Sequence, residues 1–414
     1  MQPKFVSLVY KFNDTTDLIV HGQGVFIFEN KYNSDPCIFK ILNQDKSDGL
    51  TVEFTPKSVL VNGIQNTAGL VDISNNSGLV NHAGAYYWFS LDSQNQKLCA
   101  GVGEARIENV IYQYVFPAAD KDQYVATKAF LESLVVIQTE PGSIKGTRLL
   151  RDPITIGVPL LVKNTHHLTM DMIAAGSHLP KANMSLMAQK LYDCIAGQKF
   201  LLDTPDFPDF SKAIEYSIAT PGLWCNKTLA TKSREFNKDK PNLAETYLRI
   251  TLNQNNGESP GIPYVMEIWP VGHYSPIHNH GDSEAVIRVL HGAINVSLFP
   301  FLCAEKDGIK PFGTANFVKG DITWISPTLN QVHQLKNLDT NKQTCITIQC
   351  YMYDNENLTH YDYFDYIDAD GKQQQYTPDS DMDFIKFKEH MRAEWAARPK
   401  KTLCEKLMQC FKCV

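Results

Sequence analysis

Short apolar stretches separated by turn-forming residues fill the first 140 positions of the chain. Examples are residues 24–28, 50–54 and 86–91, with polar stretches such as residues 75–78 between them. Runs of four to eight residues rich in Val, Ile, Phe and Tyr, bounded by Gly, Asn and Ser, are typical of β-strands. The regular return of such runs predicts a β-sandwich over residues 1–140.

The pattern changes after residue 140. Residues 141–180 contain several prolines and are expected to form a connector. Helical spacing then appears at five apolar positions, Met184, Met187, Leu191, Cys194 and Ile195. A second short helix is predicted around Ala213 and Ile214, strands from residue 246 to about 353, and a helix over residues 380–397. We therefore expect a mainly β chain with a second domain over residues 181–396 and a tail over residues 397–414.

Composition narrows the class of protein. Of the 414 residues, 43% are hydrophobic and 20% are charged, which excludes global disorder. Lys and Arg number 39 against 45 Asp and Glu, a formal net charge of −6, and this balance argues against a nucleic-acid partner. The first ten residues lack the features of a signal peptide, and no apolar run reaches about 18 residues. These observations predict a cytoplasmic protein without a transmembrane segment.

Ten cysteines are scattered along the chain, and free thiols in a reducing compartment are expected for them. The tail contains Cys404, Cys410 and Cys413 among lysines, with one C-x-x-C spacing and no second pair to complete a zinc site. Lipidation, a redox pair and an amphipathic packing helix all remain open for this tail.

The segment with the most chemistry contains His278 and His280, which lie two residues apart. On a strand, residues at that spacing point to the same face, and two neutral imidazoles suit a divalent ion such as iron, zinc or copper. A third histidine, His333, follows a later apolar stretch. Together the three histidines predict a metal site inside a small antiparallel barrel that resembles a cupin. The adjacent pair His166 and His167 is not favoured as a metal site, because neighbouring side chains diverge.

Residues 230–395 resemble the cysteine dioxygenase family, thiol-oxidising enzymes with a cupin barrel. Five motifs carry the resemblance: Tyr247-x-Arg249; Trp269-x-x-Gly272-His273-x-Ser275-x-Ile277-His278-x-His280-x-x-Ser283; His333-x-x-x-Asn337; Ile346-Thr347-Ile348-Gln349-Cys350-Tyr351; and Phe364-Asp365-x-x-Asp368-x-x-Gly371. The resemblance covers about 40% of the chain, residues 230–395. It implies an oxidoreductase that adds both atoms of O2 to the sulfur of L-cysteine, forming cysteine sulfinate.

The resemblance also implies roles for individual residues. The three histidines match the ligands of Fe(II), and Arg249 matches the arginine that binds the substrate carboxylate. Tyr351 matches a tyrosine that hydrogen-bonds near the thiol and O2, and Tyr247 is expected to line the substrate site. Neutral ligands leave Fe(II) its full charge, which would lower the pKa of an incoming thiol. Arginine suits a carboxylate because its planar guanidinium can donate two parallel hydrogen bonds.

Several alternatives stay open at this stage. Glu284 completes an H-x-H-x3-E pattern like that of germins, which would make it a fourth, anionic metal ligand. Tyr353 is an alternative to Tyr351 for the role of the family's tyrosine, since a small error in aligning this strand is easy to make. Ala285 occupies a position where many family members carry a cysteine crosslinked to the tyrosine, so that crosslink cannot form here. The substrate could also be another small mercapto-acid.

The N-terminal region resembles, more weakly, the lectin-like sandwich of farnesoic acid methyltransferase-like domains. Two stretches carry this resemblance, Tyr87-Trp88-Phe89-Ser90-Leu91 and Gly101-Val102-Gly103-Glu104. It implies an accessory module with a glycan or protein ligand. It also leaves open a non-catalytic glycan-binding adaptor, in which the second domain would hold no iron.

Overall fold

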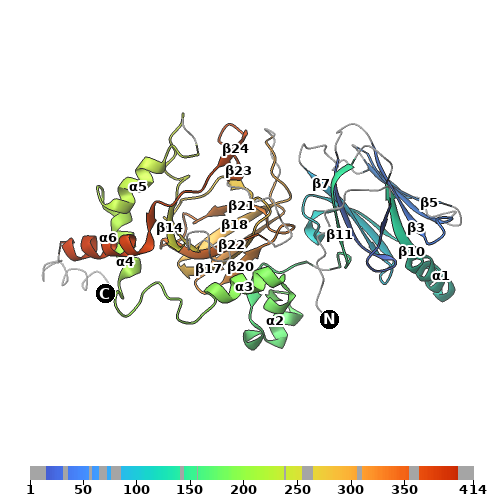
Figure 1. Cartoon of the computed structure of the whole chain (residues 1–414), viewed down its shortest axis with the longest axis horizontal. Helices are drawn as coiled ribbons and strands as arrows, with labels where there is room; N and C mark the ends of the chain where they lie inside the picture. The colour runs from blue at the N-terminus through green and yellow to red at the C-terminus, as the bar shows by residue number, and fades with distance from the viewer. Residues whose placement is uncertain are drawn as a thin grey trace.

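The chain folds into two mainly antiparallel β units, the second of which is packed against helices, and this confirms the prediction of a mainly β protein (Figure 1). The computed structural model describes residues 15–30, 36–55, 58–64, 72–75, 85–139, 144–155, 157–236, 239–253, 264–304, 310–353 and 363–399. Figure 1 shows the N-terminal unit at one end of the molecule, the second unit in the middle, and α4, α5 and α6 at the other end.

The N-terminal unit is a sandwich of two sheets, as predicted. One sheet has the order β1 (Thr15–Asp17), β10 (Leu134–Thr139), β3 (Cys37–Asn43), β4 (Gly49–Phe54), β5 (Ser58–Gly63) and β6 (Asp72–Asn75). The other has the order β11 (Ile144–Leu150), β2 (Gln23–Asn30), β7 (Tyr86–Asp92), β8 (Lys97–Val102) and β9 (Val110–Val115). The two sheets enclose an apolar core in which Phe26, Phe28, Phe39 and Phe89 contact one another.

The second unit is built from an eight-stranded and a six-stranded sheet. The larger sheet has the order β13 (His178–Pro180), β12 (Leu161–Lys163), β20 (Ile322–Ile325), β17 (Glu284–His291), β22 (Cys345–Met352), β15 (Tyr264–Trp269), β14 (Leu248–Asn253) and β25 (Met382–Asp383). The smaller has the order β19 (Gly313–Val318), β18 (Ala293–Phe299), β21 (Val332–Lys336), β16 (Ile277–His278), β23 (Phe364–Ile367) and β24 (Gln373–Tyr376). We call this unit the barrel, because its two sheets enclose the cavity described below.

Helices cover the outer face of the larger sheet. They are α3 (Leu186–Ile195), α4 (Phe210–Ala219), α5 (Trp224–Lys232) and α6 (Phe384–Ala397). Strands β14, β15 and β22 are therefore apolar on their outer face, where it meets the helices, and line the cavity with the other face. This arrangement explains why β22 is buried almost throughout instead of alternating between buried and exposed residues.

The remaining short elements are α1 (Lys121–Glu132), α2 (Met170–Ala174) and the 3₁₀ turns η1 (Ile107–Asn109), η2 (Thr165–His167) and η3 (Lys181–Asn183). Helix α1 was not expected in a region predicted to contain strands. Most of its residues are exposed, and its sequence therefore has no strong apolar stripe that would predict a helix. The main sequence signal for this helix is its N-terminal cap, where Asp120 accepts a hydrogen bond from the backbone N–H of Gln123 at 2.8 Å.

One predicted helix boundary was wrong, and the first position of the predicted helical spacing, Met184, lies outside its helix. Helix α3 begins after Met184, because Ser185 caps it by accepting a hydrogen bond from the Ala188 N–H at 3.0 Å. Helix α6 begins at Phe384 and not at residue 380, because β25 first pairs in parallel with β14. The expected connector, residues 141–180, contains three strands: β11 pairs with β2 of the sandwich, and β12 and β13 join the barrel.

Two further expectations concern cysteines and membranes. Seven cysteines lie within the described residues, and no disulfide joins any two of them: Cys37, Cys99, Cys194, Cys225, Cys303, Cys345 and Cys350. Cys404, Cys410 and Cys413 lie outside the described residues. None of the helices in the described part of the chain is long and apolar enough to cross a lipid bilayer.

Candidate metal centre

Two neighbouring strands and the loop after one of them bring the three predicted histidines together. His278 on β16 and His333 on β21 are direct partners across an antiparallel pair. His280 lies just beyond the end of β16, so the expectation that one strand carries both residues of the H-x-H pair holds for His278 alone. Potential ligand atoms of the three residues all lie within 4.8 Å of one another.

The hydrogen bonds of the rings show which nitrogen atoms face the common space. The Nδ1 atoms of His278 and His333 lie 3.0 Å from the carbonyl oxygens of Pro276 and Asn330, respectively. A carbonyl can only accept, so each Nδ1 carries the proton and each Nε2 keeps a free lone pair. The Nε2 atoms of His280 and His333 are 3.2 Å apart. Two nitrogens at that separation, each about 2.1 Å from one ion, subtend about 100°, which tetrahedral and octahedral sites both accommodate.

Burial keeps the three imidazoles neutral. It lowers the pKa of His278 to about 4 and that of His333 to about 3, the latter with a further contribution from His278. Burial, followed by the other two histidines, lowers the pKa of His280 well below its ordinary value. Metal ions bind the neutral form of histidine, so three neutral, convergent imidazoles fit a divalent transition-metal ion.

The histidines open into a cavity of about 60 Å³ between the two sheets of the barrel. Most of its wall is apolar, including Leu160, Trp269, Ile287, Val289, Val296, Leu298, Phe317 and Leu335. Besides the histidines, its functional polar groups include Arg249, Glu267, Thr347, Gln349 and Tyr351. They occupy alternate positions on β14, β15 and β22, the positions that face inward in strands of period two.

Arg249, for which the family resemblance implies a role in binding the substrate carboxylate, is buried and lines this cavity. Asp381 fixes its backbone: the carboxylate accepts the Arg249 N–H at 2.7 Å, and the Asp381 N–H donates to the Arg249 carbonyl at 2.8 Å. Lys232 lies 3.2 Å from the Asp381 carboxylate and balances its charge. The guanidinium is thereby held inside the barrel and not on its solvent face.

Glu267 is the functional group that the sequence analysis missed. It is the direct partner of Arg249 across β14 and β15, and its Oε1 lies 3.7 Å from Arg249 Nη1. Burial raises the pKa of the Glu267 carboxyl, and the charge of Arg249 opposes that rise. The sequence did contain a signal for this group, because Glu267 is the one acidic residue inside the apolar strand Tyr264–Trp269. Glu267 therefore neutralises part of the positive charge of Arg249 inside the cavity.

Tyr351, and not Tyr353, lines the cavity. Its ring stacks on His280 with a centroid separation of 5.5 Å, and burial raises its pKa well above the ordinary value, so it stays a neutral phenol that can donate its O–H. Ala285 is its direct partner across β17 and β22. Tyr247 also lines the cavity and stacks on Trp269 at 4.2 Å.

Glu284 points toward α3. Ser185, the residue that caps this helix, donates a hydrogen bond to Glu284 Oε2. Strict alternation from His280 would have turned Glu284 inward, but a turn with positive φ at Gly281 (55°) and Asp282 (61°) interrupts the strand. Among the described residues, the potential metal-binding group consists of the three histidines and contains no carboxylate.

The germin-like alternative makes a direct prediction about Glu284. Glu284→Gln should leave the metal content within about a factor of two of the unmutated protein, since the side chain accepts a hydrogen bond from the cap of α3 and does not belong to the potential metal-binding group. Metal analysis after dialysis measures this. A protein that loses its metal on this substitution would show that Glu284 is a ligand.

Four other histidines, within the part of the chain that the structure describes, have structural partners or lie apart from the cavity. His273 Nδ1 lies 2.9 Å from the Thr246 carbonyl oxygen, and His291 Nε2 lies 3.4 Å from Glu215. His166 and His167 are exposed in η2. These four histidines are therefore not part of the potential metal-binding group.

Comparisons with known proteins give limited similarity. No family model matches the chain. It is 24% identical to cysteine dioxygenase type 1 of Danio rerio over 106 residues, 25% of this chain and 50% of that protein, so it spans about half the length of the curated relative it matches. Solved structures that align with it include the Cnp3 cupin domain of Schizosaccharomyces pombe (TM-score 0.21, 15% identity, 26% of this chain and 65% of that one) and a cupin superfamily protein of Desulfitobacterium hafniense (TM-score 0.19, 11% identity, 26% and 79%). At these TM-scores the structural similarity carries no argument.

Proposed function

We propose that this protein is an Fe(II)-dependent thiol dioxygenase that converts L-cysteine and O2 to cysteine sulfinate. The observation that carries the proposal is the combination, in one small cavity, of three neutral convergent histidines with a buried guanidinium and a buried phenol. The partial similarity to a cysteine dioxygenase supports it. In this reaction both oxygen atoms are transferred to sulfur, so the four electrons lost by sulfur reduce O2 and no further reductant is required.

In this proposal His278, His280 and His333 hold the iron through Nε2. When bound, Fe(II) would supply the charge that lowers the thiol pKa and the redox activity that O2 requires. Arg249 binds the carboxylate of the substrate and so fixes its orientation in the cavity. Tyr351 donates its O–H toward the reacting atoms, because its raised pKa keeps the proton on the phenol.

The apolar lining has its own role. It excludes water from a cavity of about 60 Å³, so the interaction between Arg249 and a carboxylate is stronger than it would be in bulk solvent. The same small volume favours substrates with a few non-hydrogen atoms. Glu267 moderates the affinity for an anionic substrate, because it competes for the guanidinium.

The test is O2 uptake by iron-loaded protein with a panel of small thiols: L-cysteine, 3-mercaptopropionate and cysteamine. We expect one O2 consumed per L-cysteine, with cysteine sulfinate as the product identified by mass spectrometry. His278→Ala protein, treated identically, is the control. Faster uptake with 3-mercaptopropionate would reassign the substrate, and no uptake with any thiol would contradict the proposed activity.

A further inference from the structure

Two charged residues of the N-terminal sandwich reach into the barrel next to the candidate metal centre. Glu104 and Arg106 follow β8, and both are buried. Gly103 makes this approach possible: its φ is +81°, and a Cβ there would lie 2.2 Å from the carbonyl oxygen of Pro300 in the barrel. The Glu104 N–H donates to that same oxygen at 3.1 Å. The two units therefore touch through their backbones at this point.

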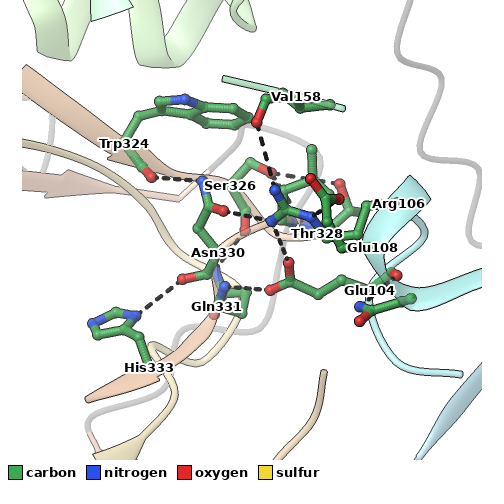
Figure 2. A network of polar contacts seen from close by, with 12 residues as sticks. Glu104, Arg106, Glu108, Val158, Trp324, Ser326, Thr328, Asn330, Gln331 and His333 are labelled. Atoms are coloured by element: carbon green, nitrogen blue, oxygen red, sulfur yellow. Dashed lines mark hydrogen bonds and ion pairs between the residues drawn. The ribbon is translucent and has the colours of Figure 1, made fainter. Parts of the chain in front are cut away.

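Both side chains bind a single turn of the barrel, Asn330-Gln331 (Figure 2). Arg106 Nη1 donates to Asn330 Oδ1 at 2.9 Å and to Glu104 Oε2 at 3.3 Å. Glu104 Oε1 accepts the backbone N–H of Gln331 at 2.8 Å. One carboxylate and one guanidinium thus hold the side chain of one turn residue and the backbone of the next. We call Glu104 and Arg106 the clamp.

The same turn holds two of the three histidines. The Asn330 carbonyl accepts the Nδ1–H of His333 at 3.0 Å, as Figure 2 shows. Gln331 Oε1 accepts the backbone N–H of His280 at 3.3 Å. His280 Nδ1 is buried and has no hydrogen-bond partner among the described residues, so the bond from Gln331 holds the backbone of His280 and not its ring.

The turn has a reason to need this support. Asn330 has φ +64°, a left-handed conformation that costs a non-glycine residue energy and persists when surrounding contacts impose it. Asn330 Nδ2 donates to the Trp324 carbonyl at 3.0 Å, so the amide is held on one side by the barrel and on the other by Arg106. Without Arg106, one of the two contacts that orient this side chain is lost.

We propose that Glu104 and Arg106 are positioning residues for the metal centre, and that the sandwich is part of this centre instead of an accessory module. The inference deepens the proposed function and rests on the metal site of that proposal, although not on the identity of the substrate. Outer partners of metal-binding histidines set ring orientation and basicity, and their loss costs about 10–100-fold in metal affinity. Residues 181–396 alone would then form an incomplete site.

Metal affinity of the full chain tests the clamp, with Co(II) as the probe. The variants are Arg106→Met and the double variant Glu104→Gln/Arg106→Met. The double variant is included in case the single variant fails to fold, because it leaves no buried charge of the clamp without a partner. We expect Co(II) affinity, measured by competition with a chelator, to fall about 10–100-fold in both. The visible absorption of the Co(II) protein should also change, because ligand geometry determines it.

Two further variants separate a specific clamp from general contact between the units. Arg148 of the sandwich also reaches the barrel, at 3.2 Å from both Asp282 and the Pro327 carbonyl, but it does not contact the Asn330-Gln331 turn. Arg148→Met should change affinity by no more than about threefold, because a partly exposed ion pair contributes little. Asn330→Gly deletes the side chain that accepts the hydrogen bond of Arg106, and glycine tolerates the positive φ at this position. It should therefore lower Co(II) affinity as Arg106→Met does, and combining the two substitutions should lower it no further.

The outcomes separate cleanly. Wild-type Co(II) affinity and an unchanged spectrum in the double variant would overturn the inference. An equal loss in Arg148→Met would also overturn it, since contact between the units would then matter without the clamp. If the clamp variants lose Co(II) affinity as expected but the unmutated protein oxidises no thiol, the proposed activity is refuted and the positioning role stands.

Discussion

Replacing His333 by alanine should abolish metal binding and, with it, all thiol-dependent O2 uptake. His333 is the direct partner of His278 across β16 and β21, and its Nε2 lies 3.2 Å from that of His280. Its loss leaves two imidazoles, and two ligands seldom retain a divalent ion. Loss of an outer partner alone costs about 10–100-fold in affinity, so loss of a ligand should cost more than about 100-fold. Metal content after gel filtration and O2 uptake measure the two effects.

His291→Ala is the matched control. This histidine belongs to β17 in the other sheet of the barrel, is partly buried, and pairs with Glu215 away from the cavity. It should keep its metal and its activity, and circular dichroism should show that both variants retain their β structure. A His333→Ala protein with full metal content would end the assignment of the three histidines as ligands.

The sequence predicted the pair His278 and His280 because the two-residue spacing itself determines where the side chains lie. Residues two apart on an extended segment face one way, so His278 and His280 could be placed without knowledge of the fold. Placing His333 beside them required more, since its partner strand lies in a different part of the chain, and the resemblance to a family supplied that link. Its pairing with His278 in the sheet agrees with this expectation.

The sequence could not predict what lies around these ligands. Glu267 faces Arg249 because two strands pair in one particular register, and a sequence does not state the register. Glu284 would point inward by simple alternation, but the turn at Gly281 and Asp282 resets the phase of the strand. Arg106 and Asn330 are 224 residues apart in sequence, so no local pattern joins them. The contact between Arg106 and Asn330 depends on how the sandwich and the barrel meet.

The pairing of Arg249 with Glu267 adds a second test of the hypothesis that Arg249 binds the substrate carboxylate. A buried arginine with a carboxylate at 3.7 Å is already partly neutralised, yet at that distance the pair leaves donor groups of the guanidinium for a second carboxylate. If the substrate carboxylate binds there, removing Arg249 weakens its capture, and removing the charge of Glu267 strengthens it. If the carboxylate binds elsewhere, neither change affects the KM for cysteine selectively.

Arg249→Met should lower kcat/KM for L-cysteine by roughly ten- to a hundredfold, because a charge-assisted hydrogen bond contributes about 1.5–3 kcal/mol. The double variant Arg249→Met/Glu267→Gln should show the same loss without an unpaired buried carboxylate, which protects the experiment against misfolding. Glu267→Gln alone should lower the KM for cysteine several-fold.

Cysteamine, which has no carboxylate, should be a poor substrate and should lose no more than about threefold in kcat/KM on loss of Arg249, since the contact that the substitution removes is one that cysteamine never makes. Metal content should stay unchanged in all three variants, because none of these side chains is a candidate ligand. If Arg249→Met oxidises cysteine as efficiently as the unmutated protein, then Arg249 does not recognise the substrate carboxylate, and the assignment of L-cysteine as the substrate loses its main physical support.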